Sequence, residues 1–369
     1  RPTQGEKPGS TVIAGYHWFG DWGRDTMVSL PGLTLTTGRP EIARDIIETF
    51  AGFISGGMLP NRFPDAGQAP EYNTVDAALW YFEAVRAYFD DTGDEKFLSE
   101  IFPALEGIID SYTKGTRYGI GADPKDGLLH AGEEGVQLTW MDAKVGEWVV
   151  TPRMGKPVEV NALWYNALRS MSAFAGIIGK PAAEFDAAAE LALSGFERFW
   201  NPDRGYCFDV VDGPGGNDPA LRPNQIFAVS LPASPLGPGR QKKVVDACAE
   251  KLLTSHGLRS LSPEGPGYKG VYGGDQPSRD GAYHQGTVWG WLIGPFALAH
   301  MKEYGDAEKA RGLLKPMLEH MRAAGVGTMS EIFDGNPPMT PRGCIAQAWT
   351  VAEALRAFAE IDKMSHGKK

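Results

Sequence analysis

Apolar side chains recur at every third or fourth residue through long segments of this 369-residue chain. Such spacing places them on one face of an α-helix, whereas a half-buried strand would alternate with a period of two. No run of alternating strands interrupts the pattern, so the chain is predicted to be all-α. Helices are predicted near 75–89 and 164–178, and over 25–36, 39–54, 94–113, 182–199, 221–232, 240–255, 285–303, 305–324 and 342–361.

The predicted helices come in pairs. Short turns that contain glycine join the two helices of a pair at 38–40, 92–94, 179–181 and 304–306, whereas long loops rich in glycine, proline and aromatic residues separate the pairs. This asymmetry is typical of a closed ring of helical hairpins, in which one rim is tight and the other carries a site built from loops. The hairpins repeat at about 50 to 65 residues, too irregularly for a uniform solenoid.

About eleven helices are predicted, and both the first and the last have the character of inner helices. A closed (α/α)6 barrel of six hairpins needs twelve. The missing outer helix is expected upstream of Arg1, in a parent chain with a further N-terminal domain. Because composition does not shift along the sequence, residues 1–369 are predicted to form a single catalytic domain that residues 1–14 join to the parent as a linker.

Charge and cysteine content exclude several classes of protein. A net charge of -10 and a pI near 5.3 leave no basic block to neutralise a nucleic acid. Cys207, Cys248 and Cys344 are odd in number and far apart, which favours neither a disulfide framework nor a zinc site and indicates a reducing, cytoplasmic setting. No apolar run approaches the roughly 20 residues that span a bilayer, so no membrane partner is expected.

The first candidate site segment, residues 16–26, combines aromatic residues with two acids and an arginine directly before a predicted helix. Aromatic faces stack on pyranose rings, while Arg24 and Asp25 could bind vicinal hydroxyls by charge-assisted hydrogen bonds. The alternative is structural, with Asp25 capping the helix and Arg24 paired to it.

Two further loops offer acids for proton transfer. Asp142 follows Trp140, and burial against an indole raises the pKa of a carboxyl group, as a general acid requires. Glu133, Glu134 and Glu147 compete for that role. Glu331 stands between apolar residues before the last predicted helix and could activate a water molecule. Alternatively, Glu331 or Asp334 caps that helix or closes a turn before Pro337 and Pro338.

Polar residues also stand at the predicted starts of three inner helices, on the rim with the long loops. Helix capping explains any one of these segments but explains three together less well. His284 has no second histidine at helical spacing, so no metal site is expected, and nucleotide-binding glycine motifs and a Gly-x-Ser-x-Gly elbow are absent. The polar candidates are Asn73, Asp76, Glu159, Asn161, His284 and Gln285.

Segments 18–26, 139–143, 283–289, 330–335 and 341–349 together resemble the C-terminal catalytic domain of glycogen-debranching enzymes, the amylo-α-1,6-glucosidase. The resemblance runs from about Gly15 to Phe358 and keeps the order of the motifs. It implies an (α/α)6 barrel related to glucoamylases and trehalases, no cofactor, and inverting hydrolysis of the α-1,6-linked glucose stub of a debranched glucan. Family members usually carry an N-terminal β-rich domain, which this chain lacks.

The resemblance also implies roles. Asp142 would be the general acid and Glu331 the general base, and Arg24 with Asp25 would hold the non-reducing glucose. Inversion requires the two carboxyl groups to lie roughly 6.5–9.5 Å apart, to admit a water molecule. The residues expected to line the pocket are Trp18, Trp22, Trp140, Trp164 and Trp289.

Other functions on the same barrel stay open. A trehalase, a glucoamylase-like α-1,4-glucosidase or a processing glucosidase would use a similar site. A glycan-binding toroid without activity is a second alternative, although both acids are present. An epimerase is a third, disfavoured because such sites need paired histidines and His284 alone is well placed.

Overall fold

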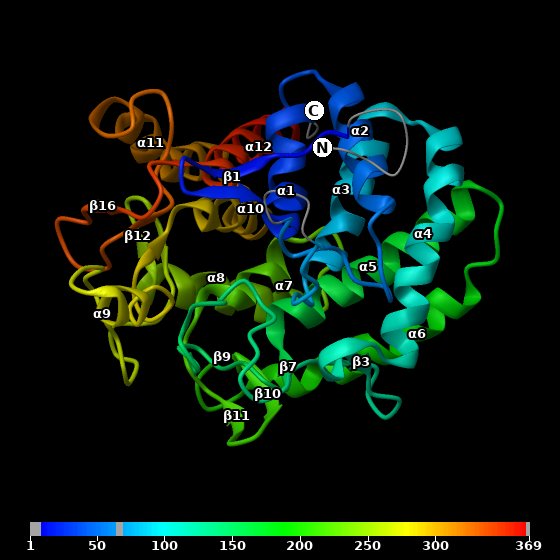
Figure 1. Cartoon of the computed structure of the whole chain (residues 1–369), viewed down its shortest axis with the longest axis horizontal. Coiled ribbons are helices and arrows are strands. Elements are labelled where there is room, and N and C mark those ends of the chain that lie inside the picture. The colour runs from blue at the N-terminus through cyan, green and yellow to red at the C-terminus, as the bar shows by residue number, and fades with distance from the viewer. Residues whose placement is uncertain (1–8, 64–68, 367–369) are drawn as a thin grey trace.

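The computed structural model describes residues 9–63 and 69–366. Six helices form an inner ring in which each packs against the next, and the last, α12, packs against the first, α1 (Figure 1). The ring confirms the predicted all-α toroid of helical hairpins. Its members are α1 (Gly23–Leu30), continued by the π-helical turn η1 (Pro31–Leu35), α3 (Ala77–Thr92), α5 (Val158–Ile177), α7 (Phe227–Ser230), α10 (Ile293–Tyr304) and α12 (Ala348–His366).

Five longer helices of the described residues lie outside this ring, and each packs against one or two inner helices. In Figure 1, α11, α4 and α6 lie at the outside of the molecule, whereas α1 and α10 lie within it. The outer helices are α2 (Pro40–Ala51), α4 (Glu95–Lys114), α6 (Ala183–Phe196), α8 (Pro238–Lys251) and α11 (Ala307–Ala323).

Burial distinguishes the two layers. Every residue from Val158 to Leu168 of α5 is buried, because an inner helix contacts neighbours around most of its circumference. The outer helix α8 instead buries one stripe, Gln241, Val244, Val245 and Cys248, at the i, i+3, i+4 and i+7 spacing of an amphipathic helix.

Glycine and aspartate produce the short turns at the tight rim. Gly93 ends α3 in the left-handed region at φ 64°, and Asp94 then accepts a hydrogen bond from the Phe97 N–H at the start of α4. Gly305 and Asp306 repeat this arrangement between α10 and α11. Glycine occupies the left-handed conformation without a steric cost, and the aspartate satisfies a free amide of the next helix.

The long loops carry short strands that the sequence did not predict. The helices expected to begin at Gln285 and Arg342 begin later, because Val288–Trp289 pairs with two other strands and 341–342 and 346–347 are also paired. The strands of the largest sheet, in order, are β12 (Leu253–Thr254), β13 (Gly257–Arg259), β14 (Val288–Trp289), β15 (Ile332–Phe333) and β16 (Pro341–Arg342).

Smaller sheets complete the loop-bearing rim. The expected linker 1–14 lies partly outside the described residues, and its last two residues belong to strand β1. The remaining strands are β1 (Ile13–Tyr16), β2 (Phe19–Asp21), β3 (Gly121–Ala122), β4 (Leu129–His130), β5 (Lys144–Val145), β6 (Trp148–Val149), β7 (Lys156–Pro157), β8 (Trp200–Asn201), β9 (Tyr206–Cys207), β10 (Val210–Gly213), β11 (Gly216–Asp218) and β17 (Ala346–Gln347). Short helical turns are η3 (Arg117–Gly119), η4 (Glu197–Phe199), η5 (Pro223–Ile226), α9 (Gln276–Asp280) and η6 (Gly290–Leu292).

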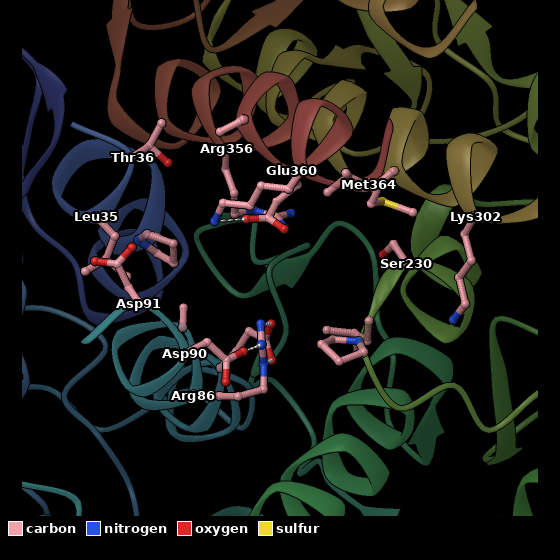
Figure 2. Close-up of a pocket in the computed structure, with 18 residues that line it drawn as sticks. Leu35, Thr36, Arg86, Asp90, Asp91, Ser230, Lys302, Arg356, Glu360 and Met364 are labelled. Atoms are coloured by element: carbon pink, nitrogen blue, oxygen red, sulfur yellow. Dashed lines mark hydrogen bonds and ion pairs between the residues drawn. The ribbon is translucent and has the colours of Figure 1, made fainter. Parts of the chain in front are cut away.

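A large cavity of about 700 Å³ opens at the tight rim, where the inner helices end. Figure 2 shows Arg86 and Asp90 of α3 facing Arg356 and Glu360 of α12 across it. Arg86 pairs with Asp90, and Arg356 lies 2.5 Å from the Glu353 carboxylate. Arg86 and Arg356 of this cavity, which we call the far cavity, are therefore each paired with a carboxylate, and none of the predicted site residues lines it.

No helix in the described part of the chain combines the length and the apolar character needed to cross a bilayer.

Candidate active site

Arg24 organises the centre of the loop-bearing rim. Its buried guanidinium donates to Asp76 at 2.8 Å, to the Thr74 hydroxyl at 3.0 Å and to Asp142 at 3.1 Å. Asp76 stands at the start of α3, and its side chain accepts from Arg24 and Thr74 and makes no capping bond to the helix. A guanidinium with its donors committed to three groups is a fixed support. The capping explanation for Asp76 is therefore wrong.

Two buried residues fix the segment that carries Asp142. The Trp140 indole N–H donates to Asn224 at 2.7 Å, and Asn224 donates in turn to Asp209 at 2.7 Å. Met141 lies against the same group, with its sulfur 3.6 Å from the Asn224 nitrogen. Because both residues preceding Asp142 are held from behind, its carboxyl group has a defined position in the pocket.

Glu331 is buried more deeply and is held through both backbone and side chain. Its backbone N–H donates to the Cys344 carbonyl and its own carbonyl accepts from the Gly290 N–H. One carboxylate oxygen accepts from the Cys344 N–H at 2.9 Å, and the other accepts from the Tyr283 hydroxyl. Glu331 therefore makes no helix cap, and Asp334, which pairs with Arg342, makes none either.

Asp142 and Glu331 line one pocket of about 110 Å³ at this rim. The competing acids do not reach it, since Glu133 and Glu134 are exposed and the Glu147 side chain is 99% exposed. Aromatic rings and three carboxyl groups dominate the surface of this pocket. Its lining residues are Ala14, Phe19, Trp22, Arg24, Asp25, Trp140, Asp142, Tyr283, Trp289, Glu331, Gln347 and Trp349.

The three carboxyl groups lie in a site from which water is largely excluded, and the Arg24 guanidinium binds one of them, Asp142. Loss of hydration raises the pKa of Asp25 to about 8 and that of Glu331 to about 7. It also raises the pKa of Asp142, against the opposing effect of the Arg24 charge. Such a set holds at least one proton near neutral pH, so the pocket can contain a proton donor and an ionised base together.

An aromatic stack closes the pocket toward the barrel axis. Trp349 stacks on Trp291 at 4.8 Å between ring centres, Trp291 stacks on Phe227 at 5.3 Å, and Trp80 meets Phe227 edge-on at 5.3 Å. Trp140 also meets Trp291 edge-on. We call Trp80, Phe227, Trp291 and Trp349 the aromatic plug. It separates the active-site pocket from the far cavity.

The five tryptophans that were predicted to line the pocket do not all do so. Trp22, Trp140 and Trp289 line the pocket together with Arg24 and Asp25. Trp18 is 61% exposed at the turn between β1 and β2, outside the pocket. Trp164 lies in the core, where its indole donates to the Gly127 carbonyl. Aromatic residues in one motif can thus point to different surroundings.

Several predicted polar residues support the site from behind and do not line it. Glu159 pairs with Arg153, which also binds Asp209 at 2.7 Å. Gln285 donates to the Thr151 hydroxyl at 2.9 Å and accepts from Arg222 at 3.1 Å. These contacts continue the network that holds Trp140 through Asp209 and Asn224.

The other three candidates lie in the surrounding structure. His284 is fully buried, with its ring stacked on Trp289 at 4.9 Å, and this burial lowers the pKa of the imidazole well below its usual value. Asn161 binds both the N–H and the carbonyl of Leu129. Asn73 accepts from Asn61. None of the three is among the residues that line the pocket.

Sequence reasoning missed several residues that line the pocket or position its acids, including Ala14 and Gln347 of the lining. Tyr283 and Trp349 stood inside the motifs, but their roles depend on folding that brings them to Glu331 and to the aromatic plug. Arg222 and Asn224 gave no local signal, because they meet Met141 and Trp140 from more than 80 residues away. Phe19 lines the pocket although its neighbour Trp18 does not.

Metal chemistry has no evident ligand set here. Within residues 9–63 and 69–366, no three histidine, cysteine, aspartate or glutamate side chains gather in a manner that could hold a metal ion.

Comparison with known proteins agrees with this geometry. The family model described as amylo-alpha-1,6-glucosidase matches residues 3–356. The chain belongs to the amylo-alpha-1,6-glucosidase family. The glycogen debranching enzyme of Saccharomyces cerevisiae is 29% identical over an alignment that covers 75% of this chain and 24% of the yeast protein. The chain thus spans about a quarter of that relative's length.

Solved structures confirm the (α/α)6 barrel for this amylo-alpha-1,6-glucosidase family member. A GH63 mannosylglycerate hydrolase from Thermus thermophilus in complex with glucose has a TM-score of 0.69 at 17% identity, over 94% of this chain and 95% of the other. A GH78 rhamnosidase of Bacillus sp. GL1 has a TM-score of 0.60 at 16% identity, over 89% of this chain and 31% of the other. Family membership makes the chain a glycoside hydrolase.

Proposed function

We propose that this glycoside hydrolase removes single α-1,6-linked glucose residues from debranched glycogen or limit dextrin, with inversion at the anomeric carbon. The observation that carries the proposal is the convergence of Asp142 and Glu331, 189 residues apart in sequence, in one pocket lined by aromatic rings. The family model and the yeast debranching enzyme support the glucan substrate.

The proposed reaction is a single displacement. Protonated Asp142 donates its proton to the glycosidic oxygen, so that the bond to the anomeric carbon breaks and the glucan leaves as an alcohol. Ionised Glu331 takes a proton from a water molecule whose oxygen attacks the anomeric carbon from the opposite face. Arg24 and Asp25 lie where they can bind hydroxyls of the glucose, and the aromatic plug leaves no room for a further sugar beyond it.

A small acidic leaving group, as in mannosylglycerate, is the second candidate because the GH63 neighbour acts on that substrate. The charges of the pocket favour a neutral leaving group. Among the described residues that line it, Arg24 is the sole cation, and its positive charge is already paired with the carboxylates of Asp76 and Asp142. A glycerate carboxylate beside Asp142 would add a further negative charge next to this pocket, whose one described cation is already paired.

Substrate preference and product configuration test the proposal together. We expect the purified chain to release glucose from a maltooligosaccharide that carries one α-1,6-linked glucosyl branch faster than from maltose, trehalose or mannosylglycerate. Proton NMR of the first product should show β-glucose, because attack from the opposite face inverts the α-linkage. Early α-glucose would refute inversion, and preferred cleavage of trehalose or mannosylglycerate would refute the glucan assignment.

The Tyr283 hydroxyl should set the acid limb of the pH profile. Its hydrogen bond favours ionised Glu331 and so opposes the loss of hydration that raises the pKa of Glu331 to about 7. As the base must be ionised, kcat/KM should fall as the pH drops below this value. In Tyr283→Phe the lost hydrogen bond raises the pKa of Glu331 further, so the limb should move to higher pH.

The pH dependence of kcat/KM for the wild type and Tyr283→Phe measures this shift. Tyr272→Phe is the matched control, because the Tyr272 ring packs against Tyr283 while the donor to Glu331 is retained. A limb that stays in place or moves to lower pH in Tyr283→Phe would show that the hydroxyl does not stabilise the ionised base.

A further inference from the structure

The different burial of the two acids indicates where the leaving group lies. The Asp142 side chain is 28% exposed, whereas Glu331 is 3% exposed. The general acid therefore stands at the boundary between the pocket and solvent, and the base stands at depth. Because the acid must reach the glycosidic oxygen, the glucose lies inside and the rest of the substrate passes outward beside Asp142.

A β-hairpin begins directly after Asp142, and its turn at 146–148 is exposed to solvent. The Val150 N–H donates to the Ala143 carbonyl at 3.1 Å, and the pairs Lys144 with Val149 and Val145 with Trp148 extend the hairpin away from it. Two residues of strand cover about 7 Å. Trp148 therefore pairs with Val145, about two strand residues along the hairpin from Ala143, the residue that follows Asp142.

The Trp148 ring contacts neighbouring residues while almost half of the residue stays exposed to solvent. The Lys269 ammonium lies 5.7 Å from the ring centre, and β5 of the hairpin packs against α9. The ring also approaches the Gly281 backbone so closely that a Cβ there would lie 2.9 Å from it. Even so, Trp148 is 47% exposed. Gly281 precedes Tyr283, which lines the pocket, by two residues in the sequence. The Trp148 ring therefore contacts a segment that leads directly into the pocket.

A single exposed tryptophan is common on protein surfaces and carries no meaning alone. Trp148 differs because its hairpin grows from the acid, beside which the leaving group emerges, and because its neighbours limit its rotation. An aromatic face kept rigid and open beside a sugar pocket offers a stacking surface for the apolar face of a pyranose.

We propose that Trp148 is a platform for the α-glucan main chain that bears the glucose stub. This inference rests on the proposed function and extends it, because it assigns recognition of the leaving group to a residue outside the pocket. Binding energy from this contact would hold the glycosidic oxygen at Asp142, so it favours polymeric substrates over small ones.

The experiment compares two substrates that share the glucose and differ in the leaving group. One is a maltooligosaccharide with a single α-1,6-linked glucosyl branch, and the other is α-glucosyl fluoride, which has no sugar to stack on Trp148. In Trp148→Ala, kcat/KM for the branched substrate should fall by about 10-fold or more, mainly through KM, as for loss of a tryptophan anchor. For α-glucosyl fluoride it should stay within about 2-fold. Trp148→Phe, which keeps an aromatic face, should restore most of the loss.

Each other outcome decides against the platform in a distinct way. If Trp148→Ala cleaves the branched substrate as fast as wild type, the platform is wrong and the proposed function stands. If the loss on the branched substrate lies in kcat while KM stays unchanged, as expected when the general acid is misplaced, Trp148 acts by holding the hairpin and Asp142. If the wild type cleaves α-glucosyl fluoride but no branched glucan, the proposed function fails, and the inference fails with it.

Discussion

Replacing Asp142 by asparagine is expected to lower kcat/KM for a glucosyl-branched maltooligosaccharide by about 10³-fold, within the range that general acid catalysis contributes. The amide cannot give a proton to the glycosidic oxygen, so the glucan would have to leave as an unprotonated alkoxide. The fold should persist, because Trp140 and Met141 keep their contacts with Asn224 and an amide oxygen can still accept from Arg24.

Two substrates with different leaving groups distinguish a role of Asp142 as proton donor from a merely structural role. Fluoride departs without a proton, so Asp142→Asn should hydrolyse α-glucosyl fluoride far better than it hydrolyses the branched glucan. Glu147→Gln is the matched control, since this acid lies on the hairpin that follows Asp142 but its side chain is 99% exposed. If Asp142→Asn lost activity equally on both substrates, the assignment of the general acid would be wrong.

Glu331→Gln should lower activity by about 10³-fold on both substrates, because an attacking water must lose a proton whatever the leaving group is. Glutamine has the shape of glutamate, so it keeps an oxygen that can accept from Tyr283 or the Cys344 N–H. Binding of glucose should therefore change little. Measured rates on the branched substrate and the fluoride, with product inhibition by glucose, would test these statements.

A Glu331→Gln variant that kept its rate on α-glucosyl fluoride would contradict the role of base. Its melting temperature provides the control for folding. In the wild type the pKa of Glu331 is raised to about 7, mainly by loss of hydration. The neutral amide avoids that desolvation of a charge, so the variant should be at least as stable as wild type near neutral pH and above, where the wild-type carboxylate is ionised.

The barrel could be predicted because its signals are local. Helical periodicity and turns such as Gly93 with Asp94 depend on residues within one or two helical turns of each other. The strands of the rim could not, because Val288–Trp289 becomes a strand by pairing with Leu258–Arg259 and Ile332–Phe333, more than 25 residues away. Two-residue strands leave no alternating pattern long enough to distinguish from a helix start.

The same reasoning explains which parts of the site were found. Asp142 and Glu331 stood out because an acid beside apolar or aromatic neighbours in sequence tends to be buried with them. The residues that hold these two acids in place gave no such signal in the sequence. Asn224 meets Trp140 from 84 residues away, and Trp349 joins the pocket through the closure of α12 onto α1. Trp18 is the opposite case. Its motif predicted that it would line the pocket, but the turn between β1 and β2 places it outside.

Among the described residues, the aromatic plug closes the catalytic pocket on the side that faces the far cavity. Under the proposed function, a glucan could not thread through the ring, and each liberated glucose would depart by the route that the next chain end uses to arrive. Free glucose should compete with incoming chain ends, so turnover is coupled to how quickly the monosaccharide escapes past Asp142.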